Sequence, residues 1–306
     1  MNDKLIEFKG VTKRFGKNVV LDSIDLTIPE GKITGIIGAS GEGKSTILKL
    51  ISSFYLPTKG KIFYLGRSIQ KDISNISKFF GLSIEEGSFY EKLTVKENLF
   101  HFGRLYSVKK NVLKKRTEEI ISLVGLEQAE DTLARDLSVG MKKRLDIGCS
   151  LVNKPTLLVL DEPTADLDPL LRKQIMDLVK KINSHGTTIV LTTQLLDGAE
   201  EMCDNIAILF NEKIVEEGTS KKIKTKYKSS DLNGVFTKIF SKKNRKAYQE
   251  SKKKKTKVNL PKKNEAKKPN LVNDTSELKK AIKKNVTKRK SLKFLEKKLK
   301  ELDDGN

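Results

Sequence analysis

The chain has 306 residues, of which 37% are hydrophobic and 33% are charged. This length suits one large domain with an appendage, or two small domains. The net charge is +6 over residues 1–240 and +16 over residues 241–306. No apolar run reaches the ~18 residues of a membrane span, and the acidic, alternating start is unlike a signal peptide. These features exclude an integral membrane protein and predict a soluble, intracellular domain with a basic tail.

The first half of residues 1–240 changes from strand-like to helical spacing. Residues 4–37 alternate between apolar and polar side chains and end in the short apolar segment ITGIIG, which predicts strands. A glycine-rich turn follows, and then a helix expected from about Lys44 to Ser53. The segment KIFYLG, at 61–66, predicts another strand. From about Thr94 to Leu151 the apolar spacing is helical.

The second half of this region alternates strands with helices. The segment LLVLD, at 157–161, is a continuous apolar run that ends in an acid, as in a parallel strand buried on both faces. A helix follows with Pro169 in its first turn. The strand TTIVLTT, at 187–193, and a strand pair within 205–219 complete the region. This alternation predicts an α/β fold with a largely parallel sheet.

The tail, residues 241–306, is rich in lysine. Few apolar residues and two prolines in its first half predict disorder. A helix is expected over about 275–302, with Asp274, Thr275 or Ser276 as its N-cap. The net charge of +16 attracts polyanions. Two partners fit, anionic lipid and RNA, and a solvated extension without a partner is the alternative.

The segment GASGEGKST has the pattern of a phosphate-binding loop, because it follows an apolar strand and opens a helix. Gly38, Gly41 and Gly43 let successive backbone N–H groups point at phosphate oxygens. Lys44 supplies a positive charge to the β- and γ-phosphates, and Ser45 offers a hydroxyl to Mg²⁺. The predicted ATP-contacting residues of the loop are Gly38, Ala39, Ser40, Gly41, Glu42, Gly43, Lys44, Ser45 and Thr46.

Two neighbouring acids end the apolar strand at 157–161. Asp161 stands where a carboxylate that organises Mg²⁺ must lie, opposite the phosphate loop. Glu162 is expected to point into the same cleft, where it could polarise an attacking water. A phosphate loop and an acidic pair together predict nucleotide hydrolysis.

Residues 4–240 resemble the ATP-binding subunit of an ABC transporter. The resemblance rests on the phosphate loop, on LVLDEP, on TADLD as the D-loop and on LSVGMKKRLDIG (137–148) as the signature region. It implies a P-loop NTPase core with an antiparallel β subdomain and an α-helical signature subdomain at about 94–151. The segments LDPLLRKQIMDLVKKIN and SSDLNGVFTKIF look most like the ABC-2 type export branch.

The resemblance also implies a head-to-tail dimer with ATP held between two chains. Ser138 and Gly140 would then contact the γ-phosphate across the interface, and Asp168 would link the two sites. Phe15 matches the aromatic residue that stacks on adenine; a core aromatic on a strand is its alternative reading.

Three positions depart from the family's pattern. The signature reads LSVGM instead of LSGGQ and keeps Ser138 and Gly140. Glu85 stands where a glutamine normally contacts Mg²⁺; a carboxylate can still bind the metal, but it would bring negative charge near the γ-phosphate. A solvated residue in a shifted loop is its alternative reading. Gln194 replaces a histidine that holds the γ-phosphate. Its amide can still donate a hydrogen bond, and the exchange is expected to slow hydrolysis about tenfold.

The function expected from these features is an Mg²⁺-dependent ATPase that powers a separate membrane permease, with exporter as the favoured class. Such a subunit would lie in the cytoplasm against the inner face of the membrane. One alternative is a soluble ABC ATPase that acts on the ribosome or RNA through the basic tail. Another is that the chain forms the degenerate half of a heterodimer rather than a homodimer.

Overall fold

The computed structural model describes residues 4–71, 73–84 and 87–239. Glu85 and the tail, with the helix expected over 275–302, lie outside the described residues. The boundary expected near residue 240 therefore stays a prediction.

The N-terminal strands form an antiparallel sheet of order β2-β1-β4-β5 among the described residues. Leu5, Ile6 and Phe8 on β1 are buried, whereas Lys9 and Arg14 are exposed. The bounds are β1 Lys4–Phe15, β2 Asn18–Pro29, β4 Lys59–Tyr64 and β5 Arg67–Ser68. The antiparallel β subdomain implied by the family resemblance is therefore present.

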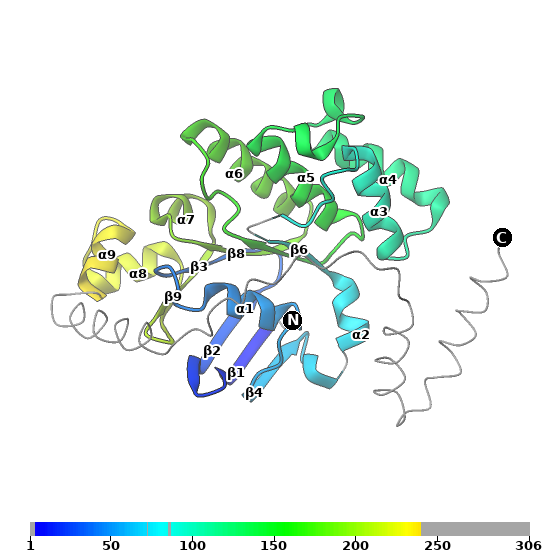
Figure 1. Ribbon diagram of the computed structural model, residues 1–306. Coiled ribbons are helices and arrows are strands. Elements are labelled where there is room, and N and C mark those ends of the chain that lie inside the picture. Colours follow the sequence, from blue (N-terminus) through cyan, green and yellow to red (C-terminus); the bar gives the residue numbers. More distant parts are fainter. Residues whose placement is uncertain (1–3, 72, 85–86, 240–306) are drawn as a thin grey trace, which may run out of the picture. The chain divides into compact units, whose positions relative to one another are not determined.

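The second sheet has the order β10-β9-β3-β8-β7-β6 within the described ranges (Figure 1). Its strands run parallel except for the antiparallel pair β9–β10, which confirms the prediction of a largely parallel sheet. Every residue of β3, β7 and β8 is buried, as expected for strands covered on both faces. The bounds are β3 Ile33–Ile37, β6 Phe80–Ser83, β7 Leu157–Asp161, β8 Thr188–Thr193, β9 Asn205–Phe210 and β10 Lys213–Gly218.

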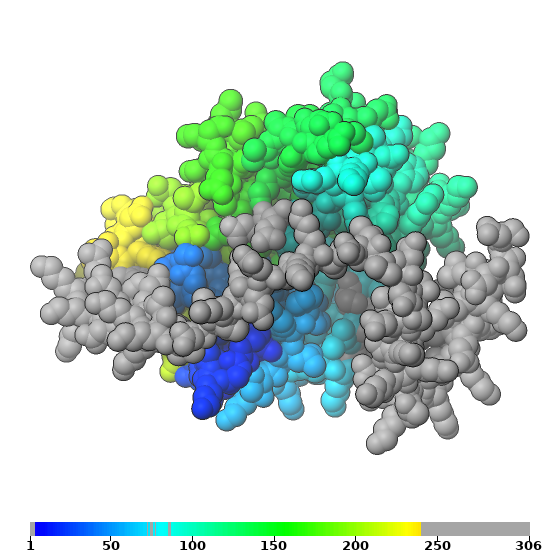
Figure 2. Space-filling view, viewed as in Figure 1, coloured from blue at the N-terminus to red at the C-terminus, as the bar shows by residue number. Residues whose placement is uncertain are grey.

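The helices of the described residues divide between the two faces of this sheet. Their bounds are α1 Lys44–Ile51, α2 Ile73–Ile76, α3 Val95–Leu105, α4 Lys110–Val124, α5 Val139–Leu151, α6 Pro169–Ser184, α7 Leu196–Met202, α8 Ser220–Tyr227 and α9 Leu232–Ile239. Figure 1 shows α3 to α6 on one side, and α1 with β1 and β2 on the other. In Figure 2 the green residues gather at the top of the view and the dark-blue residues near the N-terminus lie at the bottom.

Successive side chains of the central strands pack into two separate hydrophobic cores. On β7, Leu158 and Leu160 pack with α3 to α7, whereas Leu157 and Val159 pack with α1 and the antiparallel sheet. This follows from the two-residue period of a strand. The strand ends that carry functional residues are therefore held from both faces.

Local signals set the helix ends. Thr94 and Glu97 form a reciprocal capping box at the start of α3. Pro169 is the first residue of α6, as predicted. The helix expected from Lys44 to Ser53 ends earlier, at Ile51, because Ser53 has a left-handed φ of 61°. In the part of the chain that the structure describes, no helix has the length and apolarity needed to cross a membrane.

Candidate nucleotide-binding site

The phosphate loop joins β3 to α1. Gly41 has a φ of 80° and Gly43 a φ of 109°, both strained for a residue with a side chain. A Cβ on Gly43 would also lie 2.9 Å from Cγ1 of Val20. Gly43 is the N-cap of α1 and, among the described residues, no side chain caps this helix end. The first amides of α1 are therefore available to an anion.

A cavity of about 280 Å³ lies over this loop. It brings the loop together with the residues that follow β7 and β8 at the carboxyl edge of the sheet. That edge is where ligands bind in open α/β sheets. Its lining residues are Val20, Ser40, Gly41, Gly43, Lys44, Ser45, Thr46, Glu162 and Gln194.

Lys44 and Glu162 form a buried ion pair in this cavity. Lys44 Nζ lies 3.2 Å from Glu162 Oε1, and the two side chains are 6% and 8% exposed. The same ammonium donates to the main-chain oxygens of Gly38 at 3.1 Å and Ala39 at 3.4 Å. The lysine predicted to bind phosphate is therefore placed next to the acid predicted to polarise water.

Thr192 lies between the two acids. Its hydroxyl donates to Asp161 Oδ1 at 2.6 Å and accepts from the backbone N–H of Glu162 at 3.0 Å. Glu162 has a left-handed φ of 47°, which is unfavourable for a residue with a side chain. The sequence showed the two acids but not the hydroxyl that joins them.

Gln194 lines the cavity and contacts Glu162 through its backbone. The N–H of Gln194 donates to Glu162 Oε2 at 3.3 Å. Gln194 therefore lines the cavity and also holds the Glu162 carboxylate through its main chain. Any residue except proline at this position keeps that main-chain bond.

Ser45 lines the cavity and offers a hydroxyl, and Asp161, the last residue of β7, offers a carboxylate but is not among the residues that line the cavity. Both are oxygen donors of the kind that Mg²⁺ takes. Within the described ranges, no three His, Cys, Asp or Glu side chains converge as a metal cage. Mg²⁺ does not require such a cage, because it keeps several waters and is held by one or two protein ligands with substrate phosphates. Glu85, the third expected ligand, is outside the described residues.

Phe15 is 42% exposed, so it is not the core aromatic that was the alternative reading. Its ring meets that of Tyr55 in a T-shaped contact with centroids 5.1 Å apart. Lys13 Nζ lies 4.9 Å from the centroids of both rings. Sequence reasoning missed Tyr55, since nothing in the segment after α1 indicates which strand end it meets.

The loop residue Glu42 is tied to the β9–β10 turn. Its Oε2 accepts from the backbone N–H of Asn211 at 2.8 Å, and the residue is buried. This hydrogen bond fixes the phosphate loop to the β9–β10 turn. Glu42 is not among the residues lining the cavity, nor are Gly38 and Ala39.

The three residues expected to act across a dimer interface lie at two neighbouring helix starts. Ser138 caps α5 by accepting from Met141 N at 3.3 Å, and Asp168 caps α6 by accepting from Leu170 N at 2.9 Å. A Cβ on Gly140 would lie 2.9 Å from Cδ2 of Leu171, so the two helix starts are in contact. None of the three lines the cavity of its own chain. Their contact with a second chain's nucleotide stays a prediction.

Asp146 on α5 is a structural residue that the sequence analysis did not identify. It accepts hydrogen bonds from Ser83 and Ser88, which stand before and after Glu85 in the chain. Its carboxylate accepts from the Ser83 hydroxyl, from Ser88 N at 2.6 Å and from Ser88 Oγ at 2.8 Å. Burial raises the pKa of Asp146, and these hydrogen bonds offset part of the shift. The signature helix is thereby joined to the end of β6.

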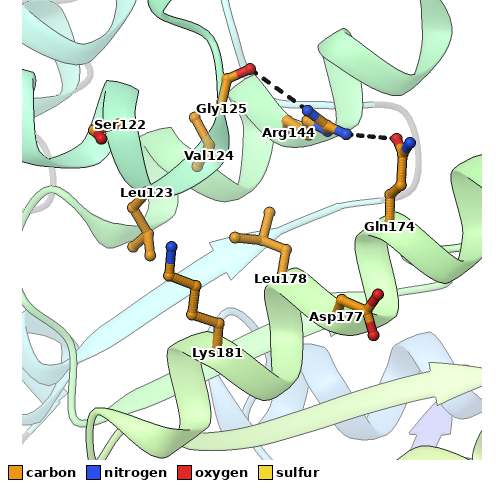
Figure 3. Close-up of a pocket in the computed structure, with 9 residues that line it drawn as sticks. All are labelled: Ser122, Leu123, Val124, Gly125, Arg144, Gln174, Asp177, Leu178 and Lys181. Atoms are coloured by element: carbon orange, nitrogen blue, oxygen red, sulfur yellow. Dashed lines mark hydrogen bonds between the residues drawn. The ribbon is translucent and has the colours of Figure 1, made fainter.

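A larger cavity, of about 400 Å³, lies between α4, α5 and α6 (Figure 3). The Arg144 guanidinium donates to Gly125 O at 3.5 Å and to Gln174 Oε1 at 2.5 Å, which links the three helices. None of the predicted site residues that the structure describes lines this cavity. The smaller cavity is the candidate site because the phosphate loop, Glu162 and Gln194 meet there.

The chain as a whole is similar to known ATP-binding proteins. The family model described as ABC transporter matches residues 21–165. The chain is 35% identical over 229 residues to the daunorubicin/doxorubicin resistance ATP-binding protein DrrA of Streptomyces peucetius, covering 75% of this chain and 69% of that protein. It is 36% identical over 220 residues to the Nod factor export ATP-binding protein I of Neorhizobium galegae, covering 70% and 61%.

A solved structure shares the fold. It is the dimeric post-hydrolysis state of the ATP-binding cassette MJ0796 bound to ADP and Pi. It superposes with a TM-score of 0.63 and 27% identity, over 70% of this chain and 98% of that one.

Proposed function

The chain belongs to the ABC transporter family as an ATP-binding ATPase subunit, and from this premise we propose that it powers a separate membrane permease of the export class. The observation that carries the proposal is the convergence of the phosphate loop, Lys44 and Glu162 in one cavity. The exporter class is supported by the similarity to proteins named for drug resistance and for Nod factor export.

The residues of the site have distinct tasks in this proposal. The loop amides and the N-terminus of α1 bind the phosphates of ATP. Ser45 and Asp161 would hold Mg²⁺, and the ion would supply positive charge to neutralise the phosphates of ATP. Glu162 accepts a proton from the attacking water. Because Lys44 is paired with Glu162, it must exchange that carboxylate for a phosphate oxygen, and the exchange releases Glu162 for its role as base.

Hydrolysis is proposed to be slow but real. Gln194 donates a neutral hydrogen bond where a histidine can donate a charged one, and the difference is worth about 1 kcal/mol or somewhat more, roughly a tenfold slower step. Glu85, at the sequence position of the family's glutamine, would add negative charge near the γ-phosphate if it takes that residue's place. Lys44, Asp161 and Glu162, whose loss would be far more damaging, are all present.

Two cassettes are proposed to close head-to-tail around ATP. Ser138, Gly140 and Asp168 would then face the nucleotide of the second chain. The adjacent starts of α5 and α6 support this arrangement, because they present all three residues from one region. The second cassette is either a copy of this chain or a paralogue with the usual glutamine and histidine; copurification from native cells separates the two.

The test of the ATPase is phosphate release by purified protein with Mg-ATP. We expect turnover above that of the variant Glu162→Gln, which keeps the shape of the side chain but cannot act as a base. Binding of Mg-ATP without such turnover would contradict the proposal. The test of the permease is copurification of a membrane protein from detergent extracts.

The charge of the basic tail favours a polyanionic partner. The tail's net charge of +16 fits an anionic lipid surface at the inner face of the membrane, which agrees with a peripheral subunit. The second candidate is RNA, as in a cassette that acts on the ribosome. Cosedimentation with anionic vesicles, and separately with ribosomes, at several salt concentrations distinguishes the two.

A further inference from the structure

Thr192 connects the two acids of the site through one hydroxyl. It lies on β8, directly opposite Asp161 on the parallel strand β7, and it is 0% exposed. The backbone N–H of Glu162 can only donate, so the hydroxyl oxygen accepts from it at 3.0 Å. The hydroxyl hydrogen is then directed to Asp161 Oδ1, at 2.6 Å.

We propose that Thr192 is a positioning residue for ATP hydrolysis, which sets the Asp161 carboxylate for Mg²⁺ and the Glu162 backbone for catalysis. This inference rests on the proposed function. Donation to Oδ1 fixes the rotation of the carboxylate, and partners of this kind orient metal ligands and tune their affinity. Acceptance from Glu162 N supports the left-handed backbone, φ 47°, that turns the Glu162 side chain toward Lys44.

The shape of the strand does not require this hydroxyl. Thr and Val are both β-branched and of similar size, and the two preceding strand residues, Val190 and Leu191, are apolar. A buried hydroxyl is unfavourable unless it is hydrogen-bonded. At Thr192 the hydroxyl is used twice, and both bonds go to the acids of the site.

Thr34 offers a matched comparison in the same sheet. It lies on β3, next to β8, and is also 0% exposed. Its hydroxyl has no hydrogen-bond partner among the described residues. The substitutions Thr192→Val and Thr34→Val therefore remove the same atom from the same kind of position, and only the first breaks bonds to Asp161 and Glu162.

Thr192→Val is expected to weaken the binding of Mg²⁺ but not the binding of ATP without the metal. Without Mg²⁺, the proposed contacts of ATP are with the phosphate loop and Phe15, whereas the described hydrogen bonds of the Thr192 hydroxyl go to Asp161 and Glu162. Thr192→Val should therefore bind ATP normally in the absence of the metal. With Mg²⁺ the gain in affinity depends on Asp161. Loss of an outer-shell partner reduces metal affinity or activity about 10- to 100-fold. Hence the Mg²⁺-dependent gain, and not the basal affinity, is expected to fall.

The experiment titrates trinitrophenyl-ATP into the full-length protein in EDTA and in Mg²⁺, and measures kcat and KM for ATP. Thr192→Val should lose about tenfold or more of both the Mg²⁺-dependent gain and kcat. Thr34→Val should match the wild type in both. Thr192→Ser, which keeps the hydroxyl, should stay within about threefold of the wild type.

Equal Mg²⁺-dependent gain and equal kcat in Thr192→Val and Thr34→Val would overturn the inference. If Thr192→Val does not fold, Thr192→Ser and Thr192→Ala replace it, because they differ only in the hydroxyl. The proposed function fails separately, if the wild type shows no turnover above Glu162→Gln. The binding titration in EDTA and Mg²⁺ still tests Thr192 in that case.

Discussion

The ion pair between Lys44 and Glu162 makes a prediction about stability as well as about catalysis. The Glu162→Gln substitution leaves Lys44 with the carbonyls of Gly38 and Ala39 and removes the only charge that compensates it among the described cavity-lining residues. Because both side chains are more than nine-tenths buried, removing one partner should lower the free energy of unfolding by about 3 kcal/mol. For a domain of this size that corresponds to a melting temperature roughly 6–12 °C lower.

Nucleotide should reverse part of this loss. In the wild type, phosphate has to displace Glu162 from Lys44, whereas in Glu162→Gln no ion pair has to be broken. ATP in EDTA should therefore raise the melting temperature of the variant by more than that of the wild type. The measurement is thermal unfolding of both proteins with and without ATP, under conditions where hydrolysis cannot occur.

A surface pair provides the control. Lys180 Nζ lies 3.3 Å from Glu201 Oε1, but these side chains are 40% and 66% exposed. Glu201→Gln should change the free energy of unfolding by less than about 1 kcal/mol. Suppose that Glu162→Gln and Glu201→Gln have the same melting temperature and that ATP raises both by the same amount. The buried pair then does not stabilise the protein, and the reasoning is wrong.

Three further predictions concern single residues. Gln194→His should raise kcat about tenfold, because a charged donor replaces a neutral one while the main-chain bond to Glu162 remains; a steady-state ATPase assay that finds no increase argues against this. Phe15→Ala should weaken ATP binding roughly tenfold through lost stacking, and Tyr55→Ala should weaken it less, as titration with a fluorescent analogue would show. Asp146 has a raised pKa when folded, so its stabilising contribution is complete below the unfolded pKa and is lost as the pH rises through the folded value. The free energy of unfolding of the wild type, relative to that of Asp146→Asn, should therefore rise as the pH falls from 7 toward 4. Chemical denaturation of both proteins at several pH values measures this, and a constant difference would contradict it.

Much of the nucleotide-binding machinery was predictable because it depends on short, local patterns. The glycines of the phosphate loop permit backbone angles that other residues avoid, and Gly41 and Gly43 adopt them. The run LLVLD is apolar throughout because β7 is covered on both faces, and this placed Asp161 at the strand end. Pro169 indicated the start of α6 for an equally local reason.

Contacts between distant segments were decided only by the tertiary structure. The sequence was enough to predict the loop, the acidic pair and the general alternation of strands and helices, because each depends on neighbouring residues. It did not predict the short strand β6, which pairs with β7 at the edge of the sheet. The pairing of Lys44 with Glu162, the hydroxyl of Thr192 between two acids and the ring of Tyr55 against Phe15 depend on how strands align and pack. Strand order and register set those contacts, since a shift of one residue turns every side chain to the other face of the sheet.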